Sequence, residues 1–215
     1  MTMQAQPSLP LSVQAAGPIS TPTRITELPG DLFDAPEGSA LIHACNTQGS
    51  WGGGIAGTFK ERYPTAYQVY RSHCLGLLRS RETHKIRDMQ THNMTSISVQ
   101  KPLGTALIIP PQPADSRPGR KKHWIICLFT SAGYGRRVDR REQIINHTYA
   151  ALRDLQEKLV DLRLDGTEPV PTALFSCQFN SGLFGVPWRD TRVALDQSGL
   201  HVTVIYPPGQ TGKTE

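Results

Sequence analysis

Short apolar runs alternate along this chain with longer segments in which apolar residues recur every three or four positions. The short runs predict β-strands, and the longer segments predict helices that lie against a sheet. Such alternation favours βαβ units around a mainly parallel sheet, and therefore an α/β fold. We predict strands at 24–28, 39–45, 104–109, 123–130, 172–177 and 201–206, and helices at 55–62, 139–160 and 188–197, with an extension of the first helix to 75 left open.

The segment 139–160 has the clearest helical pattern, because its apolar residues form one stripe that would face the sheet. By contrast, the segment 110–122 begins with Pro110-Pro111-Gln112-Pro113 and separates two predicted strands. Proline clusters of this kind predict an exposed hairpin loop. The stripe of the predicted helix consists of Ile144, Ile145, Tyr149, Leu152, Leu155 and Leu159.

The length of 215 residues suits one well-buried domain and is short for two. No run approaches the roughly 20 apolar residues that cross a bilayer, so we expect no membrane association. Residues 1–23 are rich in Pro, Ser, Thr, Gln and Ala and carry no basic residue, which predicts a disordered segment and neither a signal nor a transit peptide. We expect the folded domain at 24–207 and a flexible tail at 208–215.

The cysteines and histidines show no metal-ligand spacing. We expect the four cysteines to be reduced core residues, because a free cysteine packs as a small hydrophobe. Reduced cysteines favour the cytoplasm or nucleus over secretion. The residues considered are Cys45, Cys74, Cys127 and Cys177, together with His73, His84, His92, His123, His147 and His201.

The formal net charge of +5 comes largely from the clusters 117–122 and 136–141. Two interpretations remain open. The clusters could be solvated basic loops, or they could attract an anionic ligand or RNA.

The most distinctive stretch is 43–56, where a buried-strand pattern ends at Asn46 and the glycines 52–54 precede a predicted helix. Glycine lets backbone N–H groups approach a ligand closely, and the N-terminus of a helix favours an anion. The spacing is neither that of a dinucleotide fingerprint nor that of a P-loop. The stretch therefore predicts either an anion-binding loop or a plain strand-to-helix turn.

Two further stretches complete the pattern: Leu-Pro-Gly-Asp-Leu-Phe at 28–33 and Phe-Asn-Ser-Gly-Leu-Phe-Gly-Val-Pro-Trp at 179–188. With these motifs the chain resembles the macrodomains, the ADP-ribose-binding α/β family, from about Arg24 to Pro207. It is most similar to the fungal macrodomains that act as ADP-ribose 1″-phosphate phosphatases. The resemblance implies a three-layer α/β/α fold with a mixed, mainly parallel central sheet. It also implies hydrolysis of the terminal phosphate of a tRNA-splicing by-product.

The resemblance implies a binding site beyond the carboxyl ends of the strands. Asp31 would accept a hydrogen bond from the adenine amino group, and its alternative is a turn or N-cap aspartate. Asn46 would bind the distal ribose, whereas Trp188 is expected to pack the second loop. The expected ligand-binding residues are Gly30, Asp31, Leu32, Ala44, Cys45, Asn46, Trp51, Gly52, Gly53, Gly54, Ile55, Ala56, Asn180, Ser181, Gly182, Leu183, Phe184, Gly185 and Val186.

Elimination assigns the placement of the hydrolytic water to His43 and Asn46, the expected catalytic residues. Many macrodomains have Asn-Ala-Ala-Asn at 43–46, and several viral and bacterial relatives have a histidine where Trp51 stands. Deacylating macrodomains use a lysine near Thr130 and an aspartate where Phe184 stands, so that mechanism is missing here. For His43, a core histidine is the alternative interpretation.

Residues three apart lie on opposite faces of a regular strand, so His43 and Asn46 can share a site only if the strand breaks before Asn46. We expect catalysis without a metal or cofactor, by a monomer that acts on a small-molecule ADP-ribose derivative. Two other functions stay open: removal of ADP-ribose from modified proteins, and non-catalytic reading of ADP-ribose. We do not expect nucleic acid as a partner.

Overall fold

The computed structural model describes residues 24–79, 84–87, 94–97, 102–116, 119–166 and 169–209. The predicted disordered segment 1–23 and most of the predicted tail lie outside these residues, as does His92. No helix among the described residues is long and apolar enough to cross a membrane.

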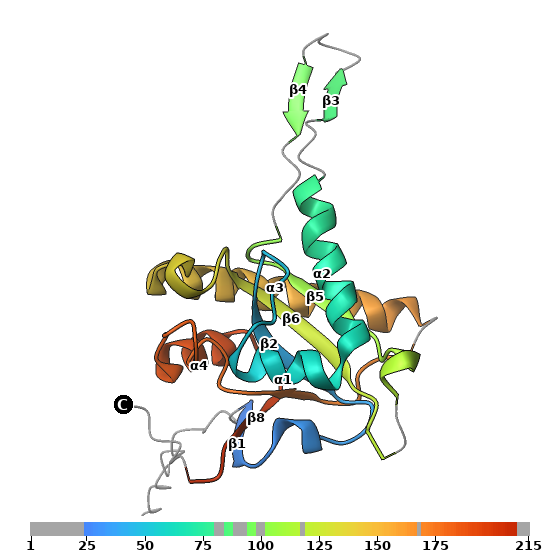
Figure 1. Ribbon diagram of the computed structural model, residues 1–215, viewed down its shortest axis with the longest axis vertical. Helices are drawn as coiled ribbons and strands as arrows, with labels where there is room; N and C mark the ends of the chain where they lie inside the picture. Colours follow the sequence, from blue (N-terminus) through green and yellow to red (C-terminus); the bar gives the residue numbers. More distant parts are fainter. Residues whose placement is uncertain are drawn as a thin grey trace, which may run out of the picture.

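A six-stranded sheet forms the centre of the molecule (Figure 1). Neighbouring strands are parallel except for the last pair, which is antiparallel, so the predicted mixed, mainly parallel sheet is confirmed. Strands β2 and β6 lie next to each other near the middle and are buried along almost their whole length, as expected of strands covered on both faces. In spatial order the strands are β1 (Ile25–Pro29), β8 (Val202–Tyr206), β7 (Leu174–Ser176), β2 (Ala40–Asn46), β6 (Trp124–Ser131) and β5 (Ala106–Ile109).

Helices cover both faces of this sheet and make three layers (Figure 1). On one face, α3 (Arg141–Asp165) packs on β6, α4 (Trp188–Gln197) packs beside α3, and both helices share a core with alternate residues of β2 and β6. On the other face, α1 (Gly54–Arg62), α2 (Pro64–Arg79) and the short helix η1 (Leu32–Asp34) enclose an aromatic-rich core. The predicted α/β/α architecture is therefore confirmed.

The structure extends one of the predicted helices, gives the optional extension of another as a separate helix, and adds elements that the sequence pattern did not reveal. The predicted stripe of α3 is at least half-buried, and the helix continues to Asp165, where Gly166 takes a left-handed conformation with φ 62°. The optional extension of the first helix is a separate helix, α2, because Pro64 is a favourable first residue but cannot continue α1.

A small antiparallel hairpin was not predicted. It consists of β3 (His84–Arg87) and β4 (Met94–Ile97). The short helices η2 (Pro113–Asp115) and η3 (Gly135–Arg137) lie in the connections on either side of β6. Strands β5 and β6 are antiparallel neighbours, so the predicted hairpin connection between them is confirmed.

Candidate functional site

The end of β2 positions Asn46. The pairing of β2 with β6 shifts register between Cys45 and Asn46, so the strand breaks where the sequence analysis required it to break. Asn46 Oδ1 accepts hydrogen bonds from the backbone N–H groups of Gln48 at 3.0 Å and Ser50 at 3.3 Å. Its Nδ2 donates to the Ser50 carbonyl at 2.6 Å, and the Tyr70 hydroxyl lies 3.2 Å from Oδ1. The amide therefore holds the loop that leads to the glycines.

The glycine loop ends at the N-terminus of α1. The N-cap residue is Gly53. Because glycine has no side chain, no N-cap side chain accepts a hydrogen bond from the first N–H groups of the helix. Gly54 has φ 55°, in the left-handed region that favours glycine. Glycines 52 and 54 are exposed. The loop thus presents backbone N–H groups and the positive end of a helix dipole to solvent.

The second loop faces the glycine loop. A Cβ atom added at Gly53 would lie 3.2 Å from Cδ1 of Leu183, and Leu183 itself is 71% exposed. Within the described part of the chain, the buried Oγ of Ser181 has no hydrogen-bond partner. A buried hydroxyl without a partner is a group that a ligand could satisfy. The structure therefore brings 52–54 and 181–183 together as expected.

Asn180 anchors the second loop and is buried below it. Its Oδ1 accepts from the Thr130 hydroxyl at 2.8 Å, and its Nδ2 donates to the Thr148 hydroxyl at 3.0 Å and to that of Thr191 at 3.4 Å. Its carbonyl accepts from Val186 N at 3.0 Å. The sequence analysis expected Asn180 to bind ligand. Both polar atoms of its side chain are instead hydrogen-bonded within the protein, where they hold the loop in place.

Asp31 caps η1, as its alternative interpretation predicted. Its Oδ1 accepts from the N–H of Phe33 at 3.0 Å. Its Oδ2 lies 3.4 Å from Nη2 of Arg62, with both side chains at least 40% exposed. An exposed ion pair of this length is weak. The outer carboxylate oxygen therefore remains accessible to a ligand while the inner one holds the turn.

A third loop follows β6. The sequence analysis named neither Thr47 nor Asp139, and it considered His147 only as a metal ligand. The Thr47 hydroxyl donates to the Ala132 carbonyl at 3.1 Å and ties this loop to the end of β2. Asp139 accepts from Ala132 N at 2.7 Å, and its carboxylate lies 3.9 Å from Nδ1 of His147. No local sequence signal marks these residues, because their partners lie on other elements.

The remaining predicted ligand residues differ in what they can offer. The side chains of Leu32, Cys45, Trp51 and Val186 are buried in the core, so only their backbones could reach a ligand. Trp188 is also buried: it packs against Phe179 and donates to Glu27 at 3.3 Å, consistent with its expected packing role. The predicted residues that are exposed or half-buried are Gly30, Ala44, Ile55, Ala56, Gly182, Phe184 and Gly185.

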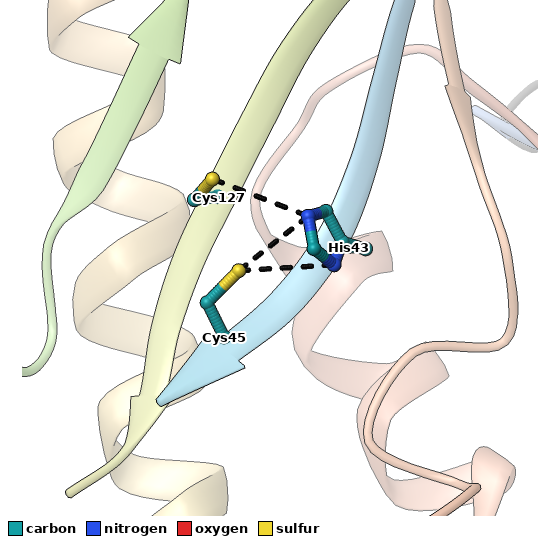
Figure 2. A group of neighbouring side chains, drawn as sticks. All are labelled: His43, Cys45 and Cys127. Atoms are coloured by element: carbon teal, nitrogen blue, oxygen red, sulfur yellow. Dashed lines mark hydrogen bonds between the residues drawn. The ribbon is translucent and has the colours of Figure 1, made fainter. Parts of the chain in front are cut away.

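His43 lies in the aromatic core. Its ring is fully buried, stacks on Phe59 at 4.1 Å between centroids and meets the edge of Trp51 at 4.9 Å. Figure 2 shows His43 facing Cys45 and Cys127 across β2 and β6. A ring enclosed in this way has no contact with solvent. The geometry favours the core interpretation of His43 over the catalytic one.

The sequence argument against a Cys/His ligand set missed this cluster, because Cys127 and His43 are 84 positions apart. Sγ of Cys45 lies 3.5 Å from Nε2 of His43, and Sγ of Cys127 lies 4.0 Å from the same atom. Burial by itself raises the pKa of the Cys45 thiol, but the hydrogen bond with Cys127, the attraction of His43 and hydrogen bonds with His43 and Trp51 together lower it to about 6. Burial raises the pKa of Cys127.

Comparison with known proteins identifies the family. A family model described as Macro domain matches residues 42–195. Proteins named ADP-ribose 1″-phosphate phosphatase from Neosartorya fischeri and Aspergillus fumigatus are each 51% identical to this chain, over 88% and 89% of it and 98% of each relative.

Solved structures agree on the fold. The macrodomain of Mycobacterium tuberculosis DarG aligns with a TM-score of 0.57 over 86% of this chain and 98% of that one, at 24% identity. Thermosipho africanus DarTG in complex with ADP-ribose aligns with a TM-score of 0.55 at 15% identity, over 88% of this chain and 43% of that one. The chain belongs to the macrodomain family.

Proposed function

We propose that this protein is an ADP-ribose 1″-phosphate phosphatase, which hydrolyses the terminal phosphate to give ADP-ribose and inorganic phosphate. The observation that carries the proposal is the match to fungal proteins of that name at 51% identity over 98% of their length. The meeting of the glycine loop with the second loop supports it, because a diphosphate needs donors from both sides.

The diphosphate would lie against the N-terminus of α1. Backbone N–H groups of 52–56 would donate to the phosphate oxygens, helped by the helix dipole. From the other side, the unpartnered hydroxyl of Ser181 would donate to the ligand, and Leu183 would cover it. This arrangement binds an anion through amides and a hydroxyl.

The adenine would lie beside Asp31. The outer oxygen of this carboxylate can accept a hydrogen bond from an exocyclic amino group, which adenine has at a position where guanine has a carbonyl oxygen. The pair with Arg62 is exposed and weak, so a ligand can compete with it. Asp31 would therefore contribute base selectivity.

The chemical step would rest mainly on the loops. Hydrolysis of a phosphate monoester needs stabilisation of charge on the phosphoryl oxygens and in-line placement of water. The amide-rich loops would stabilise the charge. Asn46 would keep the glycine loop in place through its bonds to Gln48 and Ser50. His43 would not contact the substrate. It would act as a positioning residue, because its ring packs against Trp51, which precedes the glycines.

The decisive experiment compares two substrates. Purified protein is incubated with ADP-ribose 1″-phosphate and, separately, with an ADP-ribosylated protein, and the release of inorganic phosphate and of ADP-ribose is measured. Phosphate release supports the proposal. Release of ADP-ribose from protein alone would support the removal of ADP-ribose instead, and tight ADP-ribose binding without either product would support a reader.

Gly53→Val serves as the site control, because its side chain would meet Leu183 and block the approach of a phosphate to the backbone. This variant should lose binding and turnover while it keeps the circular dichroism spectrum of the wild type. Turnover at the wild-type rate would exclude the glycine loop from the site.

The proposal also includes the cell compartment, the source of the substrate and the oligomeric state. Four free cysteines suit the cytoplasm or nucleus, where thiols stay reduced. The substrate would be the by-product of tRNA splicing that the family resemblance implies, and the protein would act as a monomer without a cofactor.

A further inference from the structure

Two thiols and an imidazole, all of them common metal ligands, meet in the core beside the start of the glycine loop. His43, Cys45 and Cys127 each offer one ligand atom, and these atoms all lie within 4.8 Å of one another (Figure 2). All three residues are between 0% and 2% exposed. His43 and Cys45 lie two residues apart on β2, and Cys127 is paired with His43 across the sheet, so the three side chains share one face.

The distances from the imidazole nitrogen to the two sulfurs are close to those around a single metal ion. Zinc binds sulfur at about 2.3 Å and nitrogen at about 2.0–2.1 Å, so a nitrogen and a sulfur on one ion lie roughly 3.5–3.8 Å apart. Nε2 of His43 lies 3.5 Å from Sγ of Cys45 and 4.0 Å from that of Cys127. One imidazole nitrogen therefore already faces both sulfurs at nearly the required separation.

A disulfide does not explain the cluster. In the parallel pairing, Cys127 lies opposite His43, while Cys45 lies opposite Phe129. This two-residue stagger separates the Cα atoms of the cysteines by about 8 Å, from strand spacings of about 4.8 Å across and 3.3 Å along. The separation exceeds the reach of about 7 Å that a disulfide allows.

Charge favours a divalent ion. The surroundings are aromatic, with Phe59 and Trp51 on the His43 ring, so a net charge would be costly there. Two thiolates and a neutral imidazole balance the charge of Zn²⁺, and binding would release the two thiol protons. Cu⁺ on the same two thiolates would leave a net negative charge.

Trp51 connects the cluster to the loop above it. Its indole N–H donates to Sγ of Cys45 at 3.3 Å, and the next residue in the chain is Gly52. Hydrogen bonds from outside the ligand set commonly fix the orientation of ligands. An ion at this position would therefore stiffen the start of the glycine loop without touching a substrate.

We propose that His43, Cys45 and Cys127 form a structural Zn²⁺ site, with two thiolates and one imidazole as protein ligands. Because the donors are enclosed by the fold, the ion would enter as the protein folds. This proposal does not depend on the phosphatase activity.

The test measures metal content directly. The full chain is unfolded in denaturant with a thiol-free reductant, refolded with Zn²⁺ and desalted, and bound zinc is determined by mass spectrometry. Co²⁺ replaces Zn²⁺ in a parallel sample, because its thiolate charge-transfer absorption reports sulfur ligation. The variants are Cys127→Ser, which removes one ligand, and Cys177→Ser, a matched control outside the cluster. Circular dichroism shows which samples are folded.

Wild type and Cys177→Ser should retain about one ion per chain, and Cys127→Ser should bind at least about 10-fold more weakly, with a weaker cobalt–thiolate band. Substoichiometric zinc in folded, fully reduced wild type would overturn the proposal and leave a hydrogen-bonded core cluster. Equal zinc affinity of wild type and Cys127→Ser would also overturn it. Retention of Cu⁺ but not Zn²⁺ in a copper arm would refute the charge argument and the zinc assignment.

Discussion

Replacing Asn180 tests whether buried hydrogen bonds, rather than contact with ligand, make this residue important. In Asn180→Ala, the Thr130 hydroxyl loses the only partner that the described structure gives it, at a cost of about 1–3 kcal/mol. The Thr148 hydroxyl still donates to the Ile144 carbonyl but loses the bond from Nδ2, about 0.5–1.5 kcal/mol. Asn180 also has φ 67°, which disfavours alanine by about 1–2 kcal/mol.

Together these effects predict a loss of about 2.5–6.5 kcal/mol in the free energy of unfolding. For a domain of this size, such a loss lowers Tm by roughly 5–26 °C. Binding of ADP-ribose should weaken as well, because the loop that carries Ser181 and Leu183 loses its anchor.

Two matched variants separate the causes. Asn180→Gly keeps the tolerance for positive φ and should be about 1 kcal/mol less destabilised than Asn180→Ala. Thr191→Val removes only the longest bond of the network, 3.4 Å, and should cost about 0.5–1.5 kcal/mol. Chemical denaturation gives these energies, and calorimetry gives the affinity for ADP-ribose. An Asn180→Ala protein as stable as the wild type, with weakened ADP-ribose binding, would refute this reasoning and return Asn180 to direct ligand contact.

Four further predictions concern the site and its support. Asp31→Ala should weaken ADP-ribose by about 1.5–3 kcal/mol in calorimetry, because a charge-assisted hydrogen bond is lost, and unchanged affinity would remove Asp31 from the adenine site. His43→Gln should lower Tm, because the ring stacked on Phe59 is lost, and leave kcat within about 10-fold, whereas a fall of about 100-fold at unchanged Tm would restore a catalytic role. Brief exposure to EDTA should leave turnover intact, since backbone amides face the phosphate; a loss that Mg²⁺ restores would contradict this. Burial lowers the pKa of His123, whose ring accepts from Tyr63, so unfolding takes up a proton and the free energy of unfolding should fall as pH drops through about 6.5. His123→Phe should reduce this slope and leave the part that comes from His73, whose pKa burial also lowers.

The sequence by itself determined most of the elements and marked a loop whose chemistry suits an anion. Periodicity of two and of about 3.6 residues is a local property, so the six strands of the central sheet and the stripe of α3 could be predicted from neighbouring residues. The need for a break before Asn46 also followed from local geometry, and the register shift between Cys45 and Asn46 meets it. The glycines at 52–54 marked the N-terminus of the helix, because a glycine run between a strand pattern and a helix pattern is also a local feature of the sequence.

Only the tertiary structure decided what the polar side chains do. Asn46 and Asn180 have side-chain amides that could bind a ligand. In the structure these amides form hydrogen bonds with Ser50, Thr130 and Thr148. The packing of the loops and helices determines which partners they meet. The hairpin β3–β4 had no clear pattern because its strands are only four residues long.

The cluster of His43, Cys45 and Cys127 shows most clearly what only the tertiary structure decides. His43 and Cys127 are separated by 84 positions, and no spacing rule spans that distance. They meet because β2 and β6 are parallel neighbours in a register that places His43 opposite Cys127. Strand register depends on the packing of the whole sheet between its helices, so the sequence named these residues while the fold alone brought them together.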